Sequence, residues 1–162
     1  MPTLTVPQLA EVCGPLDGKG KQLDADRLRL WIRRLRHWIT LGILPPSVGQ
    51  DSESVYIAAI LLRIADTGLP ATLIKSLSAE LHAKVGRTRT GFAKIWREAT
   101  GTQRPSGIFH YLIVQVSKEG TASKVSISRT DTPKSAYLGD FGPRLDTAFI
   151  VNLSEVFRVV HA

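Results

Sequence analysis

The sequence contains only one cysteine, Cys13, among its 162 residues. A disulfide bond within the chain is therefore excluded, and so is a zinc site built from several cysteines. The four histidines, which have no metal-ligand spacing, are His37, His82, His110 and His161. We expect neither a metal nor a cofactor, and the shortage of cysteine favours a reducing compartment.

Long hydrophobic runs are missing as well. The richest apolar stretch, VYIAAILL, stops at Arg63 and is far shorter than the roughly 20 residues that cross a bilayer. The first residues, MPTLTVPQLAEV, lack the basic end and apolar run of a signal peptide. We therefore expect a protein of the cytoplasm with no membrane segment.

The sequence also lacks the motifs of catalytic sites. Gly120, Gly139 and Gly142 do not form a phosphate loop or a dinucleotide fingerprint. No serine lies in a nucleophile-elbow pattern. We expect no enzymatic activity.

Acidic residues are fewer than basic ones. There are 14 Asp and Glu against 21 Lys and Arg, which gives a net charge of +7 and a pI near 9.9. Residues 1–106 carry 15 basic and 9 acidic residues, a net of +6, and residues 107–162 carry the remaining +1. This distribution is typical of a nucleic-acid binder with a second module, or of a generally basic surface.

Hydrophobic spacing and turn residues predict an α+β fold, with helices first. We expect helices over residues 5–13, from Asp24 or Asp26 to Leu41, over residues 55–67, from Pro70 to about Leu81, and over residues 92–99. The runs FHYLIVQV and SKVSISRT predict a hairpin. AYLGDFG is a third strand or a turn, and the tail ends in a helix capped by Asn152 or Ser154.

The helix predicted over residues 25–41 has two contrasting faces. Its apolar stripe consists of Leu28, Trp31, Ile32, Leu35, Trp38 and Ile39, and we expect both tryptophans in the core. Its opposite arc of roughly 60° holds Arg29, Arg33, Arg36 and Thr40, widened by Arg27, Arg34 and His37. A solvated face usually mixes signs, whereas this one has only Asp26. Because arginine makes bidentate contacts to phosphate and guanine, the pattern favours DNA contact.

Three segments resemble MerR-type helix-turn-helix regulators, over about residues 4–82. They are LTVPQLAEV, LRHWITLGILPP and VYIAAILLRIADTGLPATLIKSL. The resemblance implies a winged helix-turn-helix with residues 25–41 in a major groove and Arg36 facing DNA. The expected wing, SVGQDSES at 47–54, lacks the usual arginine and carries Asp51 and Glu53. The family's long dimerisation helix is replaced by a β-rich segment.

Together these patterns predict a winged helix-turn-helix over 1–85, a linker with a short helix over 86–106, and a small α/β dimerisation or effector segment over 107–162. Arg87 and Arg89 in the linker either touch phosphate or are simply solvated. The predicted function is sequence-specific transcriptional regulation, in a bacterial or phage protein associated with the nucleoid. Double-stranded DNA is the expected partner, with a homodimer favoured and RNA polymerase a further candidate. The alternatives are an excisionase-like or architectural DNA-binding factor, and a protein–protein adaptor.

Overall fold

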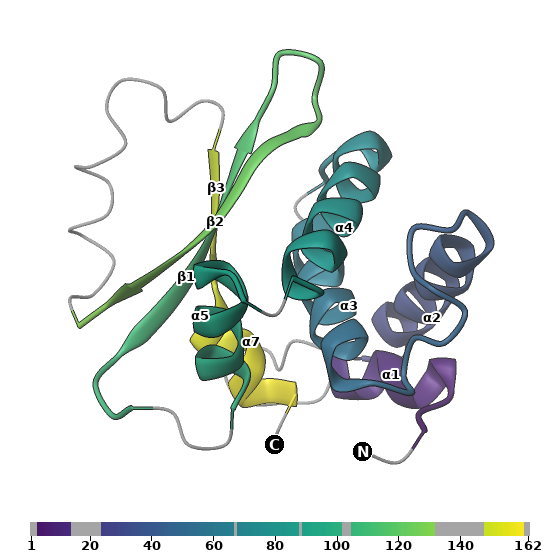
Figure 1. The fold of residues 1–162 in the computed structure, drawn as a ribbon. Coiled ribbons are helices and arrows are strands. Elements are labelled where there is room, and N and C mark those ends of the chain that lie inside the picture. Colours follow the sequence, from purple (N-terminus) through teal and green to yellow (C-terminus); the bar gives the residue numbers. More distant parts are fainter. Residues whose placement is uncertain are drawn as a thin grey trace.

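The computed structural model describes residues 3–13, 24–66, 68–87, 89–101, 105–131 and 148–160. The helices are α1 (Val6–Cys13), α2 (Ala25–Thr40), α3 (Ser52–Ala65), α4 (Ala71–Val85), α5 (Gly91–Thr100) and α7 (Leu153–Val160). The strands are β1 (Phe109–Val116), β2 (Ala122–Thr130) and β3 (Ala148–Asn152). Helices precede the sheet and a last helix follows it, which confirms the α+β class (Figure 1).

Helix α2 begins and ends close to where its sequence signals predict. The Asp24 carboxylate accepts a hydrogen bond from the Arg27 N–H at 2.8 Å and so caps the first turn. Gly42 follows the last turn with a φ of +66°, a left-handed conformation that glycine adopts without strain. These two signals give α2 its length of 16 residues.

The connection between α2 and α3 differs from the predicted wing. Residues 41–51 form turns with one isolated bridge, between Val48 and Asp51, and no β-hairpin. The Asp51 carboxylate accepts a hydrogen bond from the Ser54 N–H at 2.7 Å and caps α3. Residues 52–54, predicted to belong to the wing, are instead the first turn of a helix, because the side-chain cap satisfies one of its open N–H groups.

The sheet is antiparallel and has the strand order β2-β1-β3. Strands β1 and β2 form the hairpin that the sequence predicts, with Leu112 opposite Ile127 and Val114 opposite Val125. On the other side of β1, Leu112 pairs with Val151 of β3. Helix α7 follows β3 directly, in agreement with the predicted final helix. The segment AYLGDFG, at 136–142, lies outside the described residues.

A single hydrophobic core joins the helices to the sheet. Helices α4 and α5 contact β2, and α7 contacts β1. The Trp96 ring of α5 meets the Phe157 ring of α7 edge-on at 5.6 Å between centroids, and Phe157 meets Tyr56 of α3 at 4.7 Å. Helix α5 lies within residues 86–106 and confirms the short helix predicted there over residues 92–99, and its Trp96 is fully part of the core. The burial of this aromatic side chain fixes α5 against its neighbours.

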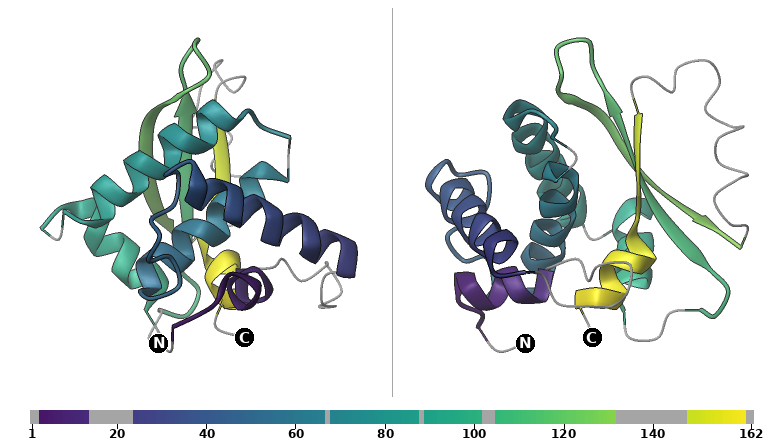
Figure 2. Two further views of the ribbon diagram at one scale, coloured as in Figure 1. Left: turned by 90° about the vertical axis from the view of Figure 1, so that its right-hand side faces the viewer. Right: turned by 180° about the vertical axis from the view of Figure 1, so that it is seen from behind.

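Helix α2 lies at the edge of the molecule that is farthest from the sheet (Figures 1 and 2). It packs on α1, and one long side remains open to solvent. In the left view of Figure 2, α2 lies in front of the other helices.

Candidate nucleic-acid interface

The inner face of α2 is apolar and buried. Trp31 and Leu35 are completely buried and Trp38 nearly so, while Leu28, Ile32 and Ile39 pack partly buried against the same core. The prediction that both tryptophans belong to the core is confirmed. They are therefore not available for stacking on bases.

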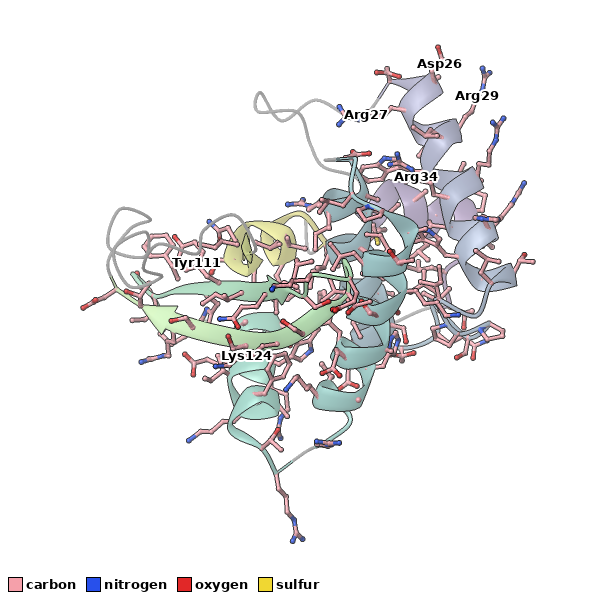
Figure 3. The ribbon with its side chains drawn as sticks, turned by 90° about the horizontal axis from the view of Figure 1, so that it is seen from above. Asp26, Arg27, Arg29, Arg34, Tyr111 and Lys124 are labelled. Atoms are coloured by element: carbon pink, nitrogen blue, oxygen red, sulfur yellow. The ribbon has the colours of Figure 1, made fainter. Side chains whose placement is uncertain are left out.

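The outer face of α2 carries the charge. Arg29, Arg33, Arg36, His37 and Thr40 are all exposed. From Arg29 to Thr40 the row covers eleven helical steps, or about 16 Å along the helix axis. Figure 3 shows Arg29 projecting away from the rest of the molecule. A row of this length suits the floor or walls of a DNA major groove, which admits one α-helix.

Arg27 and Arg34 lie on the flank of α2 that faces α3. Arg27 Nη2 lies 3.0 Å from Asp66 Oδ2, and Arg34 Nη1 lies 2.5 Å from Asp66 Oδ1. Asp66 is the C-cap residue of α3, and its side chain is 17% exposed. These two of the seven predicted site residues therefore help to fasten α2 to α3, and Asp66 neutralises part of their charge.

Asp66 also binds the indole of Trp31, whose Nε1–H donates to Oδ1 at 3.1 Å. One carboxylate thus serves three side chains from consecutive turns of α2. No sequence signal marks Asp66, because its partners are more than 30 residues away. The sequence gives the helix and its charged arc but not the side on which two of the arginines are held.

The remaining arginines differ in their partners. Arg29 Nη1 lies 3.2 Å from Asp26 Oδ1, with both side chains largely exposed, so solvent screens this pair. Within the described part of the chain, neither Arg33 nor Arg36 forms an ion pair. The Thr40 hydroxyl donates to the Arg36 carbonyl at 3.0 Å. Arg33 and Arg36 thus have guanidinium groups that can bind a ligand without breaking a salt bridge.

Two exposed leucines border this row and were not predicted as site residues. Leu30 is 42% exposed and Leu41 is 50% exposed. In the sequence, Leu30 can be recognised because it falls off the apolar stripe, between Arg29 and Arg33. Apolar side chains at this position can contact the methyl group of thymine when a helix lies in the major groove.

A second polar cluster joins α5 to the sheet. Glu98 Oε1 lies 3.2 Å from His110 Nε2 and 2.6 Å from Arg129 Nε, and the His110 side chain is fully buried. The hydrogen bond from Arg129, followed by that from His110, lowers the pKa of Glu98 below its ordinary value. This cluster connects α5, β1 and β2, so its evident role is structural.

Other sites have little support in the described ranges. The described residues contain no group of three His, Cys, Asp or Glu side chains that could hold a metal ion. They also contain no helix long and apolar enough to span a bilayer. Cys13 is buried, and burial raises the pKa of its thiol well above the ordinary range, with Arg63 opposing the shift. The α2 row is the strongest candidate site on the described surface.

Comparison of the chain with known protein families, with curated proteins and with solved structures finds no match.

Proposed function

We propose that the protein binds duplex DNA through the outer face of α2, as a sequence-specific transcriptional regulator with a helix-turn-helix of the MerR type. The observation that carries the proposal is the exposed row of Arg29, Arg33 and Arg36, with which Asp26 is the one carboxylate paired among the described residues. The packing of α2 on α1 supports it, since a recognition helix needs a partner helix behind it.

The chemistry of the row fits a duplex. Like charges at i and i+4, such as Arg29 and Arg33, repel each other and cost a few tenths of a kcal/mol in an isolated helix. Phosphates remove this repulsion, and each bound phosphate releases a condensed counterion. Arginine contacts to phosphate set the register, and bidentate contacts to guanine edges supply specificity.

The proposed helix-turn-helix lacks a hairpin wing between α2 and α3. The turn segment at 41–51 contains no arginine or lysine and includes Asp51. DNA affinity must therefore come from α2 and from other basic surfaces of the chain. This departure from the MerR pattern changes which surface holds the backbone, and leaves the role of α2 as it is.

The test is selection of bound sequences from a random duplex pool at two salt concentrations. We expect a defined motif and a steep loss of affinity as salt increases, by roughly a thousandfold or more over a fourfold salt range if six or more phosphates are bound. A palindromic motif would extend the proposal to a homodimer, with half-sites about 34 Å apart.

The matched variants are Arg29→Ala with Arg36→Ala, and Lys75→Ala with Lys118→Ala. Each pair removes two positive charges from exposed positions, but only the first lies on α2. We expect the α2 pair to abolish binding to the selected motif and the control pair to leave it nearly unchanged. Equal effects of the two pairs would show that net charge alone holds DNA, and would contradict the proposal.

A further inference from the structure

A second cationic surface lies where α4 gives way to α5. Residues 81–97 contain five Lys and Arg and no Asp or Glu. We name the α4–α5 corner by the four of these that surround the turn: Lys84, Arg87, Arg89 and Lys94. Of these, Arg87, Arg89 and Lys94 are exposed, and Lys84 is half-buried.

The corner is held by defined local contacts. Thr90 donates both its backbone N–H and its hydroxyl to the Arg87 carbonyl, at 3.1 and 3.0 Å. The Thr90 hydroxyl oxygen also accepts the Ala93 N–H at 3.3 Å and caps α5. Lys84 Nζ lies 5.7 Å from the centroid of the Phe92 ring. These contacts join Arg87 to the start of α5.

The positive charges at the corner repel one another, and they are also repelled by the positive end of the α5 helix dipole. Across the residues that the structure describes, Arg87, Arg89 and Lys94 form no ion pair. The first turn of α5 has no acidic residue, although the positive end of the helix dipole favours one there. Lys94 follows directly after that turn. Lys84 lies in the last turn of α4, where the helix dipole favours a cation, but the charges at the start of α5 have no such compensation and favour a bound polyanion.

The corner lies beyond the C-terminal end of α2. The chain that follows α2 is fastened to α4, because the buried Ser78 hydroxyl donates to the Ile43 carbonyl. From Ser78, α4 continues to Gly86, a rise of about 12 Å over eight residues. The left view of Figure 2 shows α4 extending past the end of α2 toward its turn into α5. The corner therefore follows the α2 row on the side of the α2 C-terminus.

We propose that the α4–α5 corner binds the phosphate backbone of the same duplex that α2 reads, on the side of the α2 C-terminus. This inference rests on the proposed function. The corner contacts the DNA backbone in place of the hairpin wing, in addition to the contacts made by α2. Its contacts are to phosphates, so they add affinity and salt dependence without adding sequence preference.

The test compares two duplexes that both carry the selected motif, one of about one helical turn and one of about three. The corner variant is Arg87→Gln with Arg89→Gln, and the control is Lys75→Gln with Lys118→Gln. Each lost phosphate contact lowers the slope of log K against log salt by about 0.9, so we expect a decrease of nearly 2 and at least about tenfold weaker binding to the long duplex. We expect the corner variant to bind the short duplex as tightly as the parent protein does and to select the same motif. Arg87→Lys with Arg89→Lys should restore most of the affinity, because lysine also binds phosphate.

The outcomes separate this inference from the function it rests on. If the corner variant binds both duplexes like the control, the corner makes no backbone contact and the inference fails, while loss of binding in the α2 variant still supports the proposed function. If the corner variant loses as much affinity for the short duplex as for the long one, the contact does not flank the α2 site and the inference fails. If the α2 variant retains binding, the proposed function fails and the inference fails with it.

Discussion

The carboxylate of Asp66 accepts the indole N–H of Trp31 at 3.1 Å, across 35 positions of sequence. The same carboxylate holds Arg27 and Arg34. Because the indole ring is itself buried in the core, this hydrogen bond fixes the rotation of α2 about its own axis. The direction in which Arg29, Arg33 and Arg36 point is therefore set from the inner side of the helix.

Replacement Asp66→Ala should destabilise the protein by about 2 kcal/mol, because it leaves a buried indole N–H and a partly buried guanidinium without their acceptor. Urea unfolding followed by tryptophan fluorescence measures this. The matched control is Asp26→Ala, which removes a carboxylate from an exposed pair within α2 and should cost less than about 1 kcal/mol. Equal losses in the two variants would show that Asp66 does not hold α2 in place.

The neighbouring residues Arg33 and Arg34 should give opposite results. Arg33 is exposed and forms no ion pair in the described part of the chain. Arg33→Ala should therefore weaken DNA binding by about 1–3 kcal/mol, the amount expected for one lost arginine contact to a base. It should leave the unfolding midpoint unchanged. Arg34 pairs with Asp66, so Arg34→Ala should lower the unfolding midpoint and change the affinity of the folded protein much less. Both variants remove one arginine, and each serves as the control for the other. A loss of affinity equal in the two would contradict the division of the arginines into two groups.

The sequence predicts the parts of this fold that depend on local signals. Asp24 and Gly42 mark the ends of α2, and alternating residues mark the β1–β2 hairpin. The start of α3 also has a local signal, the cap at Asp51, and the prediction of a wing at 52–54 is wrong because this cap begins a helix there. A resemblance between short segments carries less information than the cap chemistry within them.

The parts that the sequence does not predict depend on long-range contacts. Asp66 looks like an ordinary polar residue at a helix end until α2 is placed beside it. Glu98, His110 and Arg129 come from three elements and meet only because the sheet packs on α5. The importance of Trp96 likewise arises from Phe157, which lies 61 positions later in the sequence. Helical periodicity gives the charged arc of α2, but it cannot show which arginines a distant carboxylate will hold.

Acid should weaken the fold through Glu98. Hydrogen bonds from Arg129 and His110 lower the pKa of this carboxyl in the folded protein, so folding favours its ionised form. The resulting stability is fully present above the unfolded value of about 4.3 and is lost as the pH falls through the lower, folded-state pKa. Compared with Glu98→Gln, the parent protein should be more stable at neutral pH, and the difference should shrink in acid.

The measurement is urea unfolding at several pH values between neutrality and about pH 3, a range that includes the ordinary titration of a glutamate. Glu80→Gln is the control, because Glu80 is exposed on α4 and forms no ion pair among the described residues. Its stability should follow that of the parent protein at every pH. A constant difference between the parent protein and Glu98→Gln across the whole range would show that Glu98 acts by packing alone.

The thiol of Cys13 should react only when the protein opens. It is completely buried between α1 and α3, where its sulfur lies 3.5 Å from the Val55 carbonyl oxygen. Burial raises the pKa of the thiol, so the thiolate that reacts with disulfide reagents is scarce in the native state. With an aromatic disulfide reagent, native protein should label slowly and protein in urea at once. Cys13 packs against α3, and Asp66 lies at the far end of that helix. We expect α1 and α2 to open together with α3, so Asp66→Ala should speed the labelling of the native protein. Fast labelling of the unaltered protein at neutral pH, without urea, would contradict the burial of this residue.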